Sequence, residues 1–375
     1  MKRIYADNKS KKITQPENIN FDVKTKSLHL IQIAAKTQSE RQLSGTDDED
    51  LRIELNHQKF PQLTNENRYF DSPAAFSGGT SKGLTKTIYF LVWLDTGPHT
   101  LRFIPDIGAT LNELNIRQIS NSAQLDELTL QVDNQAENGD RRDWITFVLV
   151  NTALTSFTPE LTLQRRFLDN DDVRVIIDGD TKKKHHNLRQ KLWYFVASLI
   201  KGESQKKKFT INFSSGLHYL EFWADRTPTL KQITFSGLIA KIPKTIQEKI
   251  IYRANQYDFD PRIMLRLVKR ESQFDLQATS HAGAKGLFQL TSITIKEIAK
   301  HGLKITDPYD VDQNIEGGFI YFNWLYQRYA GHIKKTLAAW NWGLGHVPVN
   351  KPLDWDNLPT ETQNLINDVL GDHDF

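Results

Sequence analysis

The chain contains no cysteine among its 375 residues. This absence excludes disulfide bonds, a thiolate nucleophile and cysteine-ligated zinc, and leaves the cellular compartment open. Long apolar runs are also missing: none approaches the roughly 18 residues of a membrane-spanning helix. Residues 1–12 are polar and lysine-rich, without the apolar segment of a signal peptide. The formal net charge of +3 is too small to indicate a nucleic acid partner.

Patterns for a metal or a cofactor are equally scarce. The histidines are scattered, and His185-His186 lacks the carboxylate or spaced partner of a typical metal site. There is no phosphate-binding glycine loop and no Ser-His-Asp order. We therefore expect neither a metal nor a cofactor.

The first two thirds of the chain have the texture of β-structure. Residues 1–20 read as a flexible basic tail, and residues 21–240 contain short β-branched or aromatic runs separated by turn-forming residues. Typical runs are 51–55, 88–94 and 173–177. This pattern predicts β-sandwich or jelly-roll-like modules.

An internal repeat divides this region into two such modules. The segment Gly97–Phe103 (GPHTLRF) matches Gly216–Phe222 (GLHYLEF), and the match continues downstream at the same spacing. With a boundary in the polar stretch 133–143, we expect modules at 21–135 and 140–240, each ending in a hairpin. For His99 and His218, a structural bond to a neighbouring loop is favoured over a ligand site.

After Pro243 the apolar period changes from two to 3.6, which predicts helices. Asp260 and Pro261 signal a helix start, and Met264, Leu267, Val268 and Glu271 then share one face. Burial of Glu271 would raise its pKa, as a general acid acting on a glycosidic oxygen requires. The alternative is a helix that ends at this point, with the glutamate turned towards water.

Several motifs follow in a fixed order. They are Glu271-Ser272-Gln273-Phe274, Ser280 to Leu290 (SHAGAKGLFQL), Asn314 to Gly318 (NIEGG), Ala338 to Gly345 (AAWNWGLG) and Leu358 to Thr362 (LPTET). This set closely resembles the catalytic domain of soluble lytic transglycosylases, the SLT domain of glycoside hydrolase family 23, which is related to goose-type lysozyme. The resemblance covers about residues 243–375 and implies an all-α, lysozyme-like domain after the two tandem all-β modules.

The resemblance also implies a reaction. Glu271 would protonate the β-1,4 bridge between N-acetylmuramic acid and N-acetylglucosamine in peptidoglycan, then act as the base that leaves a 1,6-anhydro sugar. Ser272, Gln289, Trp340 and Asn341 would bind substrate. The chain departs from the family pattern at several positions, above all where the usual tyrosine before the asparagine is Trp340 and where a tyrosine that contacts the catalytic glutamate is replaced by Leu365.

Two other functions remain open. A hydrolytic muramidase would need a second carboxylate to position water, and Asp275 is a candidate. A wall-binding protein whose catalytic domain has decayed would fit the missing tyrosine. We expect peptidoglycan glycan strands as the partner, with wall carbohydrate bound by the β-modules. The basic runs 182–186 and 206–208 are either solvated loops or docking points for an anionic wall polymer. The substrate implies the cell envelope or the exterior, by an export route that the sequence leaves open.

Overall fold

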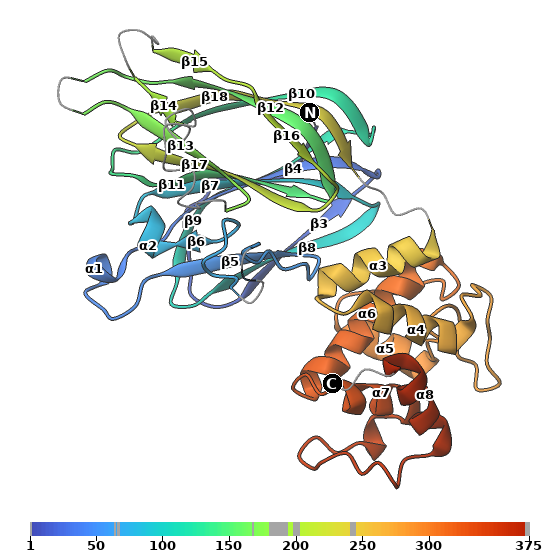
Figure 1. Ribbon diagram of the computed structural model, residues 1–375. Coiled ribbons are helices and arrows are strands. Elements are labelled where there is room, and N and C mark those ends of the chain that lie inside the picture. The colour runs from blue at the N-terminus through green and yellow to red at the C-terminus, as the bar shows by residue number, and fades with distance from the viewer. Residues whose placement is uncertain are drawn as a thin grey trace. The chain divides into compact units, whose positions relative to one another are not determined.

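The computed structural model describes residues 2–63, 65, 68–166, 169–179, 194–197, 203–240 and 245–371. The chain divides into two compact units, Met1–Ile242 and Pro243–Phe375. The first consists of strands with two short helices, and the second consists of helices (Figure 1). The expected succession of β-structure and then α-structure is confirmed.

A large central sheet runs through the N-terminal unit. Among the described residues it has nine strands, in the order β1-β9-β4-β7-β11-β17-β13-β14, with β2 beside β9. These strands are β1 (Lys2–Asp7), β2 (Lys11–Ile13), β4 (Ser27–Lys36), β7 (Thr85–Leu94), β9 (Ala109–Ser120), β11 (Arg142–Val150), β13 (Asp172–Ile177), β14 (Tyr194–Val196) and β17 (Leu217–Asp225).

Two smaller sheets pack on the central one, so that this unit has three layers (Figure 1). One has the order β3-β8-β5-β6, and the other has the order β10-β18-β12-β15 with β16 beside β12. Their strands are β3 (Glu17–Val23), β5 (Asp50–Leu55), β6 (Phe76–Ser77), β8 (Gly97–Pro105), β10 (Gln124–Gln135), β12 (Thr152–Thr162), β15 (Ser204–Lys206), β16 (Phe209–Phe213) and β18 (Thr229–Ala240). The short helices are α1 (Glu40–Leu43) and α2 (Gly78–Ser81).

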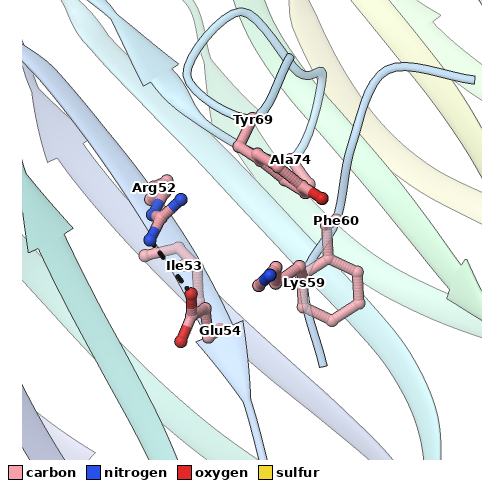
Figure 2. Close-up of a pocket in the computed structure, with 7 residues that line it drawn as sticks. All are labelled: Arg52, Ile53, Glu54, Lys59, Phe60, Tyr69 and Ala74. Atoms are coloured by element: carbon pink, nitrogen blue, oxygen red, sulfur yellow. Dashed lines mark ion pairs between the residues drawn. The ribbon is translucent and has the colours of Figure 1, made fainter. Parts of the chain in front are cut away.

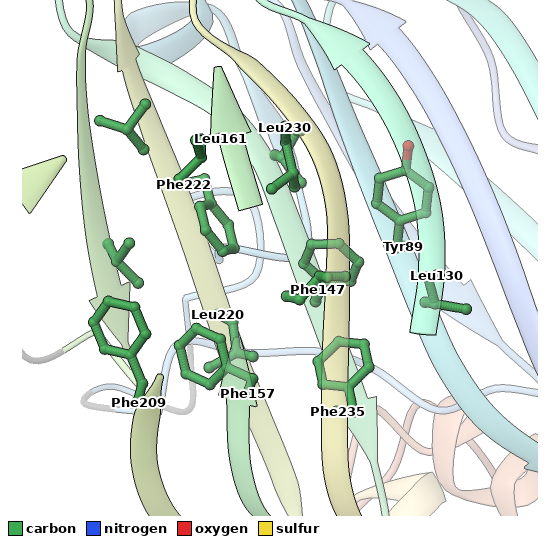
Figure 3. Close-up of a cluster of buried hydrophobic side chains, with 14 of the residues drawn as sticks. Tyr89, Leu130, Phe147, Phe157, Leu161, Phe209, Leu220, Phe222, Leu230 and Phe235 are labelled. Atoms are coloured by element: carbon green, nitrogen blue, oxygen red, sulfur yellow. The ribbon is translucent and has the colours of Figure 1, made fainter. Parts of the chain in front are cut away.

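Each pair of layers encloses an apolar core. The core beneath the β10-β18-β12-β15 sheet is rich in aromatic rings (Figure 3). The Phe147 ring lies 5.0 Å from Tyr89, 6.0 Å from Phe222 and 5.6 Å from Phe235, measured between ring centroids. The other core joins the β3-β8-β5-β6 sheet to β4, β7 and β9.

Strand β11 connects the two halves. It pairs in parallel with β7 and in antiparallel with β17, and every one of its residues is buried. Phe147 and Leu149 enter one core while Val148 and Val150 enter the other. A strand covered on both faces reads as a continuous apolar run. The two expected sandwiches therefore share one sheet and form a single unit, which corrects the prediction of separate tandem modules.

The expected boundary near residues 133–143 is also wrong. Strand β10, which ends at Gln135, pairs with β18 in a sheet of the second half. Most of its side chains are exposed or half-buried and only Leu130 is buried, so the sequence there has the polar character of a linker although it forms a strand.

The predicted flexible tail at residues 1–20 is wrong as well. Strands β1 and β2 pair with β9, and β3 pairs with β8. Strand β1 lies at the edge of the central sheet and is largely exposed, and exposed edge strands often carry lysine. The basic composition therefore reflects an edge strand.

The repeat recurs in three dimensions at its histidines. His99 and His218 each bond through Nε2 to the backbone carbonyl four residues earlier, at 2.8 Å and 2.9 Å. Each Nδ1 bonds to a loop side chain, Asn56 for His99 and Asp178 for His218. The structural role expected for both histidines is confirmed. The expected terminal hairpins are not formed, because β9 and β18 each lie in a different sheet from the strand before them.

The loop after β5 packs onto its own sheet (Figure 2). The Arg52 guanidinium lies 3.2 Å from a carboxylate oxygen of Glu54 and 5.6 Å from the centre of the Tyr69 ring. Figure 2 shows Phe60 and Lys59 on the other side of this pocket, which has no room for a water molecule. The pocket is therefore part of the packing.

Of the two basic runs, residues 182–186 lie outside the described part of the chain. In the second run, Lys206 lies 3.5 Å from Glu160, and Lys207 lies 5.3 Å from the centre of the Phe209 ring. These contacts leave both lysines at the surface of β12 and β16.

The C-terminal unit is a cluster of helices around one apolar core. The helices are α3 (Ile246–Tyr257), α4 (Pro261–Ser272), α5 (Ser292–Lys300), α6 (Val311–Arg328), α7 (Ile333–Trp342), the 3-10 turn η3 (Leu344–His346) and α8 (Thr360–Leu370). Helix α4 packs against α3 and α8. None of the helices in the described residues is long and apolar enough to cross a membrane.

Candidate active site

Glu271 lies in the last turn of α4 (Pro261–Ser272), where the sequence predicted it. The side chain of Asp260 accepts a hydrogen bond from the Arg262 amide, and Pro261 occupies the first turn, so the helix begins as expected. Met264, Leu267 and Val268 are fully buried on the face that ends at the half-buried Glu271. The buried face of α4 therefore places the Glu271 carboxyl group at the edge of the apolar core.

Trp340, near the end of α7, reaches this carboxyl group. Its indole Nε1–H donates a hydrogen bond of 3.0 Å to Glu271 Oε1. The indole ring packs among Phe288, Tyr321 and Phe322, with centroid distances of 6.1, 5.5 and 5.8 Å. Aromatic packing therefore fixes the donor, and the donor orients the carboxyl group.

Burial raises the pKa of Glu271 to about 7. The Trp340 hydrogen bond and the nearby Arg270 oppose this shift because they favour the carboxylate, whereas Glu361 reinforces it by charge repulsion. Near neutral pH the carboxyl group is therefore divided between its acid and base forms, as a group that gives and then takes back a proton requires.

Asn341 follows Trp340 and contacts α8. Its Oδ1 accepts a hydrogen bond of 2.6 Å from Thr362 Oγ1. No described residue accepts a hydrogen bond from its Nδ2. Thr362 is buried and positions the amide, a role that the sequence analysis did not assign to it.

Gln289 stabilises its own loop. Its Nε2 donates to the carbonyl oxygens of Ala278 at 3.1 Å and Gly286 at 2.8 Å. The amide predicted to line the sugar cleft is thus held by backbone, with its carbonyl oxygen directed away from these bonds. Gly286 has a φ of +72°, and a Cβ there would lie 2.5 Å from the Pro308 carbonyl oxygen, so only glycine fits.

Asn314 holds the same loop from α6. Its Oδ1 accepts from the Phe288 amide at 2.8 Å, and its Nδ2 donates to the carbonyls of Lys285 at 3.0 Å and Pro308 at 2.7 Å. Because Phe288 packs on Trp340, this buried amide supports the site indirectly. The motif at 314–318 was visible in the sequence, but it gave no sign of this bridging role.

Ser272 is buried, and its hydroxyl donates to the Val268 carbonyl at 3.2 Å. The structure therefore brings this hydroxyl to the backbone of its own helix, one turn back. Such bonds from serine to the preceding turn are common within helices.

Glu316 and Asp275 have their contacts elsewhere, whereas a third carboxylate, Glu361, acts on Glu271. Glu316 pairs with Arg253 at 2.8 Å and accepts a bond of 3.2 Å from the Tyr257 hydroxyl. Asp275 is exposed and accepts from the Gln277 amide at 2.9 Å. Glu361, in the first turn of α8, is the carboxylate whose charge acts on Glu271.

Leu365 is 3% exposed and belongs to the helical core. Trp340 is the side chain that donates to Glu271 in this chain.

Within the described residues, no group of histidine and acidic side chains is arranged to hold a metal ion.

The comparisons with known proteins concern this C-terminal region. Residues 248–354 match the family model of the Transglycosylase SLT domain. The predicted resemblance to this domain is thereby confirmed for these residues.

Two curated relatives carry corresponding names. The chain is 36% identical over 100 residues to the membrane-bound lytic murein transglycosylase F of Desulfosudis oleivorans. This match covers 25% of this chain and 21% of that protein. It is 36% identical over 116 residues to the transglycosylase of Enterobacteria phage PRD1, covering 31% and 41%. The chain thus spans well under half the length of either relative.

A solved structure also matches, that of the 70 kDa soluble lytic transglycosylase from Escherichia coli. The match has 22% identity and a TM-score of 0.30, and it covers 33% of this chain and 24% of that one.

Proposed function

We propose that the chain is a peptidoglycan lytic transglycosylase that cleaves the β-1,4 bond between N-acetylmuramic acid and N-acetylglucosamine. The observation that carries the proposal is Glu271 itself. It lies within the matched domain, and burial raises its pKa to about 7. The names of the two relatives agree with this activity.

In the proposed reaction, Glu271 first donates its proton to the bridging oxygen as the C1–O bond breaks. The carboxylate then accepts the proton of the muramoyl 6-hydroxyl as that oxygen bonds to C1, giving the 1,6-anhydro end. Glu271 returns to its acid form, so the reaction consumes no water and needs no second carboxylate. The Trp340 N–H steadies the carboxylate between the two steps.

The surrounding amides are proposed to hold the substrate. The Nδ2 of Asn341 has no acceptor among the described residues and is suited to an acetamido oxygen or a sugar hydroxyl. Gln289 would present its carbonyl oxygen from a loop that Asn314 keeps rigid. For Ser272, the bond to Val268 favours support of the helix end over direct contact with the sugar.

A hydrolytic muramidase is the second candidate, favoured by one observation. Glu361 is close enough to raise the pKa of Glu271, and it is exposed, as a carboxylate that positions water would be. Glu316 and Asp275 are less suited because their contacts lie elsewhere.

One experiment separates these functions: the purified chain is incubated with peptidoglycan, and the released fragments are identified by mass spectrometry. Anhydro-muramoyl ends support the proposal, and reducing ends support the muramidase. Sedimentation with the wall but no release would support a decayed binding protein. We further propose that the protein acts at the cell envelope and that its N-terminal unit binds wall carbohydrate.

A further inference from the structure

The N-terminal unit contains a cavity of about 460 Å³, within the usual range of small-ligand sites. It lies on the face of β17 that points away from the aromatic core. Tyr219, Glu221 and Trp223 line it, and the residues between them belong to that core. The opposite wall comes from the loop between β5 and α2, including Ser72 and Ala75, and from the start of α2.

A buried ion pair lies at the base of this cavity. Lys86 is fully buried, and its ammonium group donates to the carbonyl oxygens of Pro73 and Ala75 at 2.8 and 2.7 Å. Its third contact is Asp143 Oδ2 at 2.5 Å. The three donors of the lysine are therefore used.

The second oxygen of Asp143 is unsatisfied. Asp143 is only 5% exposed and lines the cavity, yet Oδ1 accepts no hydrogen bond from any described residue. This oxygen is itself enclosed by protein, so Asp143 makes the cavity wall polar without offering Oδ1 to a ligand.

Glu221 supplies a hydrogen-bonding group. Its Oε2 accepts from the Trp223 indole at 3.1 Å, and burial raises its pKa to about 7. At neutral pH this carboxyl group can both accept and donate. The half-buried Trp223 also supplies ring surface of the kind on which sugars pack.

The remaining charges of the cavity are balanced. Arg68 Nε lies 2.8 Å from Asp71, and His218 Nδ1 lies 2.9 Å from Asp178, whose charge favours the protonated ring. Together with the Lys86 pair, each carboxylate that lines the cavity has a basic partner except Glu221, whose raised pKa of about 7 leaves it partly uncharged at neutral pH. The described residues also include no metal-binding cluster. The lining thus suits a neutral ligand rich in hydroxyl groups.

We propose that this cavity binds a neutral saccharide, with Glu221 bonding its hydroxyl groups and Trp223 contacting its ring. The proposal rests on the wall-binding part of the proposed function and gives that part a site. It is independent of the chemistry at Glu271.

The test uses the full chain with Glu271→Gln, which prevents turnover, labelled with 5-fluorotryptophan. Fluorine NMR then follows the Trp223 and Trp340 resonances, each assigned with a Trp→Phe variant. The probes are chitotriose and maltotriose, which are neutral, and glucosamine, which is cationic. We expect at least one trisaccharide to shift Trp223 saturably. Glu221→Ala should weaken that binding at least tenfold, a loss of roughly 1.4 kcal/mol.

Two further variants complete the test. Thr80→Trp fills the cavity from its half-exposed wall without touching the buried ion pair, and should abolish the Trp223 shift. Glu127→Ala removes an exposed carboxylate on β10 and should leave binding unchanged. The proposal is overturned if neither trisaccharide moves Trp223, if only glucosamine does, or if Glu127→Ala weakens binding as much as Glu221→Ala. A shift at Trp340 alone would overturn the proposal that the cavity binds saccharide, and it would remain compatible with the proposed catalytic site.

Discussion

Each unit of this protein contains a glutamate that accepts a hydrogen bond from a tryptophan indole. In the helical unit Trp340 donates to Glu271 at 3.0 Å, and in the β-unit Trp223 donates to Glu221 at 3.1 Å. Burial raises the pKa of both carboxyl groups to about 7. The same local chemistry therefore arises on a helix end and in the middle of a sheet.

The surroundings of the two glutamates differ. Glu271 is half-buried at the end of α4, with the exposed Glu361 acting on it. Glu221 is 6% exposed and lies near the buried Asp143 and Lys86. A raised pKa alone therefore does not identify a catalytic acid, because it also arises where a carboxyl group is packed away. Access and neighbouring donors distinguish the two sites.

The largest expected effect is the loss of activity when Glu271 is replaced. Glu271→Gln should reduce the release of fragments from peptidoglycan by about 10²- to 10⁴-fold, since it removes the general acid. The control variant Glu127→Gln, at an exposed position of β10, should retain turnover within about twofold, because its carboxyl group lies in the other unit and outside both proposed sites. Mass spectrometry of released fragments measures both. Equal losses in the two variants would contradict the assignment of Glu271.

The second prediction compares buried charge in the two units. Asp143→Asn leaves the Lys86 ammonium group buried without its counter-charge and should lower the free energy of unfolding by about 3–5 kcal/mol. Glu316→Gln breaks the pair with Arg253, whose side chains are 17% and 21% exposed, and should cost about 1–2 kcal/mol because water still reaches part of the pair. Hydrogen exchange of backbone amides in β11 and α6 reports each unit separately. A cost for Asp143→Asn no greater than that for Glu316→Gln would show that the buried pair contributes little.

The third prediction uses the pKa of Glu221, which is about 7 in the folded protein against an ordinary value of 4.5 in the unfolded chain. Between these values the folded state holds a proton that the unfolded state has lost, so this group lowers stability as the pH rises through that window. Glu221→Gln should remove this slope. The free energy of unfolding of Glu221→Gln, relative to that of the unsubstituted protein, should grow by on the order of 3 kcal/mol between about pH 4.5 and pH 7 and then level off.

Urea unfolding at several pH values measures this difference, and comparison with the unsubstituted protein cancels the other titrating groups. A constant difference across the window would mean that Glu221 titrates normally. Glu127→Gln, on the exposed face of β10, serves as the control and should show no such trend.

Local patterns predicted much of the fold, and contacts between distant segments account for what they missed. Period-two runs predicted the strands of residues 21–240, and the period of 3.6 predicted α4 and its carboxylate. The parallel pairing of β7 with β11 joins segments more than 50 residues apart, and neither strand carries a sign of its partner. The tail at residues 1–20 was misread because an exposed edge strand has the composition of a loop.

The site shows the same division. Glu271 was predicted because it continues the apolar face of one helix, a pattern that the local sequence contains. Trp340 was predicted to bind substrate, and its bond to a carboxylate 69 residues earlier in the chain depends on how α7 packs. The bonds of Ser272 and Gln289 to the backbone likewise depend on local geometry that residue type does not determine.

The smallest expected effect tests whether Trp340 serves Glu271. When Glu271 gives up its proton, the carboxylate that forms is stabilised by the Trp340 N–H. Trp340→Phe should therefore reduce turnover about tenfold, from the loss of a charge-assisted hydrogen bond worth roughly 1.5 kcal/mol. The bond also lowers the pKa of Glu271, so its removal should raise that pKa and move the alkaline limb of the pH–rate profile upwards. Trp342→Phe is the matched control, because Trp342 stacks on His346 with ring centroids 4.6 Å apart. A tenfold loss without movement of the alkaline limb, or the same loss in Trp342→Phe, would assign Trp340 to packing alone.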